Sequence, residues 1–130
     1  MTSLNVASAN LSGSIPTELG LLSGSLLFKL NNNRFTGPIP SELGRLRGGV
    51  VSLRYNQLRG QLPIELSKIE GCQIFDVESN MLTGTIPTEL GLLTSVHQMS
   101  FKMNSFNSTV PTEFAALPRL RYLSVAQTNI

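Results

Sequence analysis

The side chains that most often carry out catalysis are scarce in this sequence. His97 is the only histidine and Cys72 is the only cysteine. Nucleophilic catalysis needs a base next to a serine or cysteine nucleophile, and the spacing of the chain places neither type against His97. A lone cysteine excludes an internal disulfide and a cysteine-built zinc site, and we expect Cys72 to be a small buried apolar side chain. We therefore expect no enzymatic activity, no cofactor and no bound metal.

Five glutamates recur at nearly constant intervals and form a regular set of carboxylates. A ladder of stacked carboxylates could hold a cation such as Ca²⁺. The alternative is that each glutamate lies in the first turn of a short helix, where the helix dipole favours an anion. The uniform spacing, without a ligand loop containing Asp and Gly, favours the second interpretation for Glu18, Glu42, Glu65, Glu89 and Glu113.

Length and charge limit the class of protein. The chain has 130 residues, a formal net charge of +2 and 41% apolar residues, which suits one folded domain. Such a mild charge gives no electrostatic footprint for nucleic acid, so no nucleic-acid partner is expected. No stretch reaches the roughly 18 unbroken apolar residues of a membrane span. The opening MTSLNVASAN lacks the basic and apolar regions of a signal peptide.

An internal repeat of about 24 residues indicates the elements that position the side chains. The prolines of a recurring IPTEL-like segment lie 24, 23, 24 and 24 residues apart. Ahead of each copy stand two apolar residues in alternation, as in Phe28 and Leu30 or Phe75 and Val77. This alternation predicts a short strand with one face inward. The prolines are Pro16, Pro40, Pro63, Pro87 and Pro111.

Each repeat carries the same order of structural signals. Three residues after the apolar pair stands an asparagine in four of the repeats, and its amide can satisfy backbone groups left open at a bend. Proline cannot donate to a strand ladder, so it marks the end of regular pairing. The residues after proline predict a short helical or 3₁₀ turn, with a hydroxyl near its start and a carboxylate in its first turn. A unit of this size cannot bury its apolar face alone, whereas stacked units can.

These residues resemble the plant-type leucine-rich repeat, LxxLxLxxNxLxGxIPxxLGxLxx, of receptor-like kinases, receptor-like proteins and polygalacturonase-inhibiting proteins. The stretch GTIPTELGLLTS is also similar in style to repeat proteins of diatoms and algae. The resemblance covers essentially the whole chain. It implies an α/β fold: a right-handed solenoid with a parallel concave β-sheet, a second short strand near each LxGxIP stretch, and short helical or 3₁₀ turns on the convex side. It also implies a structural asparagine ladder of Asn33, Asn56, Asn80 and Asn104.

The resemblance also sets an expectation for the organisation of the chain. Residues 1–130 are expected to form a single solenoid of five repeats of about 24 residues plus the strand of a sixth. The cysteine-paired cap that usually precedes the first repeat in this family has no counterpart here, and bare ends expose core and strand edges. We expect a segment of a longer array, and the alternative is self-association through the uncapped ends.

The outward positions of the concave strands are the expected ligand-binding surface. Counted from the repeat, the charges gather in the middle of the array, and Arg54, Glu78 and Lys102 fall in one column on successive strands. Two interpretations stay open. One is a polar hot zone anchored by Arg54 and Tyr55, and the other is an opposite-charge ladder worth a few tenths of a kcal/mol per pair. The candidate contact residues are Lys29, Asn31, Arg54, Tyr55, Asp76, Glu78, Lys102, Met103 and Tyr122.

The expected function is non-catalytic binding of a protein, peptide or glycan by part of a cell-surface receptor-like protein. The alternative is a free-standing soluble binder, such as a secreted enzyme inhibitor or an intracellular scaffold. Two N-glycosylation sequons, at Asn10 and Asn107, mildly favour an extracellular or cell-surface location, with a cytoplasmic location as the alternative.

Overall fold

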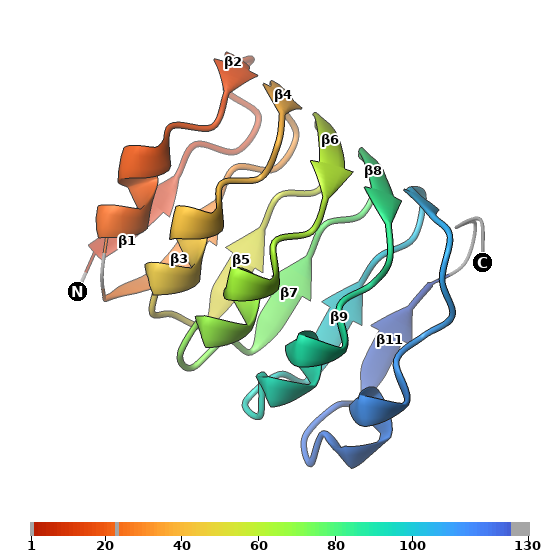
Figure 1. The fold of residues 1–130 in the computed structure, drawn as a ribbon. Helices are drawn as coiled ribbons and strands as arrows, with labels where there is room; N and C mark the ends of the chain where they lie inside the picture. Colours follow the sequence, from red (N-terminus) through yellow and green to blue (C-terminus); the bar gives the residue numbers. More distant parts are fainter. Residues whose placement is uncertain (1, 23, 126–130) are drawn as a thin grey trace.

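The computed structural model describes residues 2–22 and 24–125, which wind into coils that stack side by side, one coil per repeat (Figure 1). Each coil contributes one strand to a six-stranded parallel sheet on the concave side. Between two concave strands the chain passes through a flank strand and the convex side, so strands that are neighbours in this sheet are not consecutive strands in the sequence. The concave strands, in order, are β1 (Thr2–Asn5), β3 (Ser25–Lys29), β5 (Val50–Ser52), β7 (Ile74–Asp76), β9 (Gln98–Ser100) and β11 (Tyr122–Ser124).

The register of the concave sheet lines equivalent side chains up in columns. Ser52 pairs with Asp76, and Asp76 pairs with Ser100. A shift between Thr2 and Leu4 interrupts the pairing of β1 with β3. Side chains two residues apart on a strand share a face, so like positions of successive repeats lie within reach of one another.

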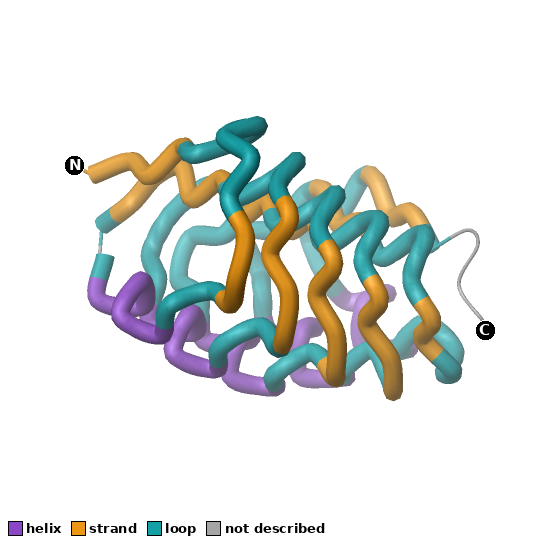
Figure 2. The backbone as a smooth tube through the Cα atoms, turned by 90° about the horizontal axis from the view of Figure 1, so that it is seen from above, coloured by secondary structure: helices purple, strands orange, loops and turns teal. Residues whose placement is uncertain are grey.

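A second parallel sheet runs along one flank of the coils, and short 3₁₀ helices form the convex side (Figure 2). The predicted solenoid with two strands and one short turn per repeat is therefore confirmed. The flank strands are β2 (Ser12–Ser14), β4 (Arg34–Gly37), β6 (Gln57–Gln61), β8 (Met81–Gly84) and β10 (Ser105–Phe106). The helices are η1 (Thr17–Leu21), η2 (Ser41–Arg45), η3 (Ile64–Lys68), η4 (Thr88–Leu92) and η5 (Thr112–Ala116).

The start of each helix shows how its hydroxyl and carboxylate are used. The N-cap residue is the proline, and it makes no side-chain capping bond. The first helical residue is instead a threonine in η1, η4 and η5, Ser41 in η2 and Ile64 in η3. The hydroxyls of Thr88 and Thr112 donate to Glu89 and Glu113. Each glutamate lies in the first turn, where the positive end of the helix dipole favours a carboxylate. The hydroxyls near the helix starts are thus left on the surface rather than bound to the helix ends.

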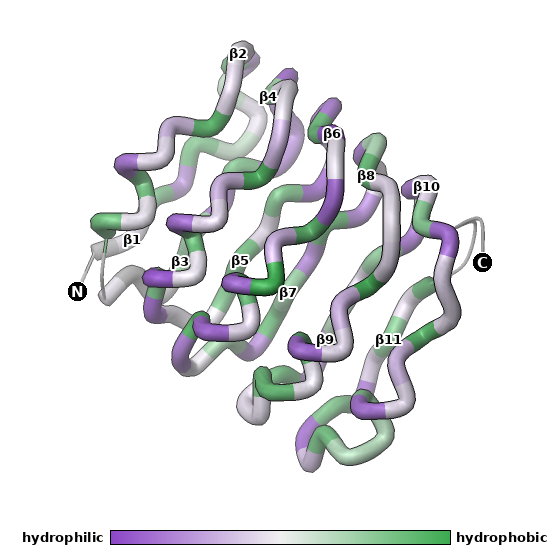
Figure 3. Tube along the Cα trace, viewed as in Figure 1, coloured by the Kyte–Doolittle hydropathy of each residue, from purple (hydrophilic) through white to green (hydrophobic). Residues whose placement is uncertain are grey.

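The space between the two sheets and the helices is filled by one continuous apolar cluster, whose members recur at the same places in successive coils (Figure 3). The ring of Phe101 lies 6.0 Å from those of Phe75 and Phe114 and 6.1 Å from that of Phe106, measured between ring centroids. Cys72 belongs to this cluster, as expected. Burial raises the pKa of its thiol to about 12, so the thiol stays protonated and unreactive at neutral pH.

Four buried asparagines connect successive coils along one edge of the concave sheet. Asn56 accepts a hydrogen bond from the backbone N–H of Phe35 in the preceding coil, and it donates to the carbonyls of Leu30 and Leu53. The Leu30 carbonyl also accepts a hydrogen bond from Asn33 of its own coil. Each such carbonyl is therefore shared by the asparagines of two coils, which adds side-chain hydrogen bonds to the backbone hydrogen bonds that join the coils at this bend. The buried asparagines are Asn33, Asn56, Asn80 and Asn104.

Candidate ligand-binding face

The concave face gathers its charged side chains over β5, β7 and β9. The register aligns Ser52, Asp76 and Ser100 in one column across β5, β7 and β9. Continued two residues further along the chain, the same register aligns Arg54, Glu78 and Lys102 in the next column. Alternation along each strand turns both columns away from the apolar core. The structure thus brings together the charges that the sequence placed in the middle of the array. We call the following side chains the concave charge network: Arg54, Tyr55, Asp76, Glu78, Ser100 and Lys102.

Asp76 is the most buried acid of this network, with 5% of its surface exposed. Its Oδ1 accepts the backbone N–H of Glu78 at 3.0 Å, and its Oδ2 lies 3.7 Å from Nη1 of Arg54. Burial raises the pKa of Asp76, while the hydrogen bond from Glu78 and the charge of Arg54 oppose that rise. Burial, together with the negative charge of Glu78, outweighs these effects, so ionising Asp76 costs more free energy in the folded chain than in the unfolded one.

Replacing Asp76 with asparagine is expected to change how stability depends on pH. A carboxyl group whose pKa is raised by folding contributes stability below its unfolded-state pKa of about 4, and this is lost as the pH rises through the folded-state pKa. The Asp76→Asn variant keeps an acceptor for the Glu78 N–H and has no carboxyl to ionise. The free energy of unfolding of the variant minus that of the wild type should therefore increase as the pH is raised from about 4 to 7. Urea denaturation of both proteins measures the difference, and a difference that is constant or shrinks contradicts the assignment.

Glu78 is the hub of the network. Its Oε1 accepts the hydroxyl of Tyr55 at 3.2 Å and lies 3.6 Å from Nζ of Lys102. Its Oε2 accepts the hydroxyl of Ser100 at 3.4 Å. Glu78 therefore pairs with one of its two column neighbours, Lys102. The other neighbour, Arg54, forms its ion pair diagonally with the adjacent column and lies 5.6 Å from the centroid of the Tyr55 ring, within cation–π range.

Tyr55 of the network, and Met103 next to Lys102 in the chain, occupy positions where the backbone is left-handed. Tyr55 has φ +56° and Met103 has φ +61°, and smaller residues hold this position in other coils, among them Asn32 and Ser79. The left-handed conformation costs a residue with a Cβ roughly 1–2 kcal/mol, and asparagine tolerates it best. Because Tyr55 and Met103 are 44% and 46% exposed, core packing does not offset this cost. The left-handed turn recurs in the first five coils and so belongs to the repeat; what is particular to Tyr55 and Met103 is that large exposed side chains occupy it.

A hollow of about 390 Å³ opens over the network and β11, and we call it the concave hollow. Its acidic side chains are buried, whereas Arg54, Arg121 and Tyr122 are exposed, Tyr122 to 65% of its surface. Sequence reasoning missed Arg121, because this residue precedes β11 and so lies outside the alternating strand positions. The charged and aromatic side chains that line the hollow are Arg54, Asp76, Glu78, Lys102, Arg121 and Tyr122.

The other candidate residues lie apart from this hollow. Lys29 ends β3, two strands away from β7, and Asn31 follows it and donates to Oδ1 of Asn32 at 2.8 Å. Asn10 and Asn107, the two sequon asparagines, are exposed next to the flank strands β2 and β10. The structure thus concentrates the candidate ligand-binding residues over β5 to β11 rather than along the whole concave face.

Comparison with known sequences identifies the repeat. A sequence profile described as Leucine Rich Repeat matches residues 27–46, which run from β3 through η2. No curated protein sequence matches the chain.

Several solved structures share the fold. The LRR ectodomain of the plant membrane receptor kinase GASSHO1/SCHENGEN3 from Arabidopsis thaliana, in complex with CASPARIAN STRIP INTEGRITY FACTOR 2, is 34% identical over 92% of this chain, with a TM-score of 0.90. The PEPR1–AtPEP1 complex is 31% identical over 97% of the chain, with a TM-score of 0.93. The ectodomain of the receptor kinase SOBIR1 from Arabidopsis thaliana is 27% identical over 97%, with a TM-score of 0.80.

The present chain spans 14%, 18% and 68% of the lengths of those three proteins, so the likeness concerns the repeated coil rather than the whole molecules. The periodic sequence, the two parallel sheets and these likenesses agree with one another. The chain is therefore a leucine-rich-repeat solenoid, similar to the ectodomains of plant receptor kinases.

Proposed function

We propose that this solenoid binds a peptide or protein ligand without catalysing a reaction, and that the concave hollow holds the ligand. The observation that carries the proposal is the meeting of buried carboxylates, exposed basic side chains and an exposed tyrosine in one hollow. Complementary charges give a binding face its specificity and fix the register of the ligand. Tyrosine and arginine are the side chains that most often anchor a partner.

The cationic members of the two ion pairs in the network are accessible to a ligand. The pair of Arg54 with Asp76 and the pair of Lys102 with Glu78 measure 3.7 and 3.6 Å, and the side chains of the two cations are 45% and 39% exposed. The carboxylates of Asp76 and Glu78 are buried, with 6% and 11% of their side chains exposed, so each needs a cationic partner in the folded chain. A ligand that displaces Arg54 or Lys102 from these carboxylates must therefore supply a basic group of its own.

We further propose that the solenoid is part of a cell-surface receptor-like protein. Two of the similar structures are ectodomains of receptor kinases, and one of these is a plant membrane receptor in complex with CASPARIAN STRIP INTEGRITY FACTOR 2. The exposure of the sequon residues Asn10 and Asn107 is compatible with passage through the secretory pathway. No helix in the described part of the chain is long and apolar enough to cross a membrane.

Selection of peptides from a random phage-displayed library against the purified chain tests the proposed site. Peptides selected on the wild type are expected to bind the Arg54→Glu variant at least about tenfold more weakly, equal to about 1.4 kcal/mol. The reversal removes the partner of Asp76 and adds a third carboxylate to the hollow. Biolayer interferometry with synthetic copies of the peptides gives the dissociation constants, after thermal melting shows that the variant is folded.

The matched control is Arg45→Glu, the same charge reversal at an exposed position on the convex helix η2. This variant should bind the selected peptides as tightly as the wild type. Equal binding to both variants and the wild type, or an equal loss in both variants, rules out the concave hollow as the binding site.

A further inference from the structure

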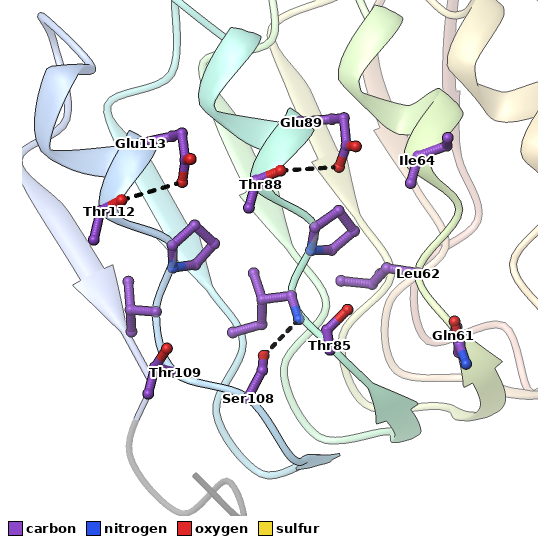
Figure 4. A pocket seen from close by; sticks show the side chains of 14 residues that line it. Gln61, Leu62, Ile64, Thr85, Thr88, Glu89, Ser108, Thr109, Thr112 and Glu113 are labelled. Carbon is purple, nitrogen blue, oxygen red and sulfur yellow. Dashed lines mark hydrogen bonds between the residues drawn. The ribbon is translucent and has the colours of Figure 1, made fainter.

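A second hollow lies where the flank sheet meets the convex helices, over the third, fourth and fifth coils (Figure 4). Its volume is about 590 Å³, and it opens beside the ends of β6 and β8 and the starts of η4 and η5. We call it the lateral groove. It shares no lining residue with the concave hollow, so a ligand here is independent of the peptide proposed above.

The polar lining of the lateral groove repeats from one coil to the next. Thr85 and Thr88 in the fourth coil are matched by Thr109 and Thr112 in the fifth, and a glutamate follows each helical threonine. Figure 4 shows the two Thr–Glu pairs at equivalent places on neighbouring helices. A ligand made of repeating units would meet the same hydroxyls and carboxylates twice.

The charge of the groove has one sign. Glu89 and Glu113 are the ionisable side chains of its lining, which contains no lysine, arginine or histidine. Without a basic side chain the groove cannot neutralise a phosphate, sulfate or carboxylate. A carboxylate only accepts hydrogen bonds, so the ligand must supply donors. Within the described residues, no group of three or more His, Cys, Asp or Glu is placed to hold a metal ion.

The chain itself engages these polar groups only weakly. The hydroxyl of Thr88 lies 3.4 Å from Oε2 of Glu89, and that of Thr112 lies 3.5 Å from Oε2 of Glu113. Both contacts are exposed and longer than the usual hydrogen bond from a hydroxyl to a carboxylate. Since a carboxylate has about four lone-pair positions, each glutamate can accept hydrogen bonds from a ligand while its threonine donates and accepts as well.

Apolar surface completes the groove. Leu62, Ile86 and Pro87 form buried parts of its lining. Ile64, at the end formed by the third coil, is 54% exposed and takes the place of the serine or threonine that starts every other helix. The exposed aliphatic side chain and the buried apolar ones offer a ligand apolar contact beside a row of hydroxyls, and small-molecule sites combine a mostly apolar lining with a few polar groups.

We propose that the lateral groove binds a neutral oligosaccharide of pyranose units. Sugar hydroxyls donate to the carboxylates and exchange hydrogen bonds with the threonines, and the C–H face of a ring can lie against Ile64. A ligand of repeating units can present the same hydroxyls to the threonines and glutamates of both coils. A cationic peptide would satisfy the two carboxylates but would leave the paired threonine hydroxyls without a role.

Nuclear magnetic resonance titration of the isotope-labelled chain with cellohexaose, xylohexaose and mannohexaose tests the proposal. At least one of these sugars, at millimolar concentration, is expected to shift the backbone signals of the lateral groove and leave those of β5 and β7 in place. Removing two hydroxyls without changing their shape, in the Thr88→Val/Thr112→Val variant, should weaken that binding about tenfold. Glu89→Gln/Glu113→Gln is a second variant, which should also weaken it because each amide loses one acceptor.

The matched control is Thr17→Val/Ser41→Ala, which removes the hydroxyls at the equivalent positions of the first two helices, outside the groove. This control should bind the sugar as the wild type does. Three results each overturn the proposal: no shift with any of the three sugars, unchanged binding by the valine variant, or a response to hexalysine alone. None of them bears on the concave hollow, whose readout is the phage-selected peptide.

Discussion

Asn80→Ala is expected to lower the free energy of unfolding by about 3 kcal/mol and the melting temperature by about 10 °C. The Oδ1 of Asn80 accepts the backbone N–H of Leu58 at 3.0 Å, and its Nδ2 donates to the carbonyls of Leu53 and Val77 at 3.0 and 3.1 Å. Alanine leaves the Leu58 N–H buried without a partner, which costs the full desolvation of that group. Each of the two carbonyls keeps the hydrogen bond from its other ladder asparagine.

Differential scanning calorimetry measures this effect, and Asn31→Ala is the control. Asn31 lies on the concave side, where its amide donates to a neighbouring exposed side chain and not to the backbone of another coil. Its replacement should change the free energy of unfolding by no more than about 0.5 kcal/mol. If Asn80→Ala melts within two degrees of Asn31→Ala, the asparagines do not hold the coils together.

Much of the fold could be predicted from the sequence because a single set of signals recurs in every repeat. The proline spacing fixes the length of a coil, and the alternating pairs such as Phe75 and Val77 fix which face of each strand points inward. Stacking identical units in register then leaves little freedom for the sheet. For this reason the inward-facing strands and the short convex helices follow from the period, whereas the parallel sheet and the flank strands are implied by the resemblance to the leucine-rich repeat.

The details of the candidate sites could not be predicted in the same way, because they depend on contacts between side chains of different coils. Arg54 reaches diagonally to Asp76, whereas the column pattern places it opposite Glu78. The left-handed backbone of Tyr55 and Met103 is a property of the bend, and the residue types at these two positions do not indicate it. The lateral groove joins residues from three coils, so no single stretch of sequence contains it.

The charge swap Glu78→Lys/Lys102→Glu is expected to abolish peptide binding while the chain stays folded. The two charges lie 3.6 Å apart, so the swap keeps an ion pair at the same place. Loss of the acceptors for the hydroxyls of Tyr55 and Ser100 should cost no more than about 2 kcal/mol of stability. The swap exchanges the positive and negative ends of this pair inside the hollow, however, and ligand groups that are complementary to the wild-type pair then meet like charges, which costs several kcal/mol.

Isothermal titration calorimetry of one phage-selected peptide with this charge-swapped chain is the most direct test of whether the concave charge network recognises a ligand. The control is the swap Arg47→Glu/Glu70→Arg, which inverts an exposed ion pair of 3.4 Å that lies outside the concave hollow. We expect the affinity to fall by roughly a hundredfold or more with the first swap and to stay unchanged with the second. If the swap of Glu78 and Lys102 leaves the affinity at the wild-type value, the network is only a stabilising charge ladder and the ligand binds elsewhere.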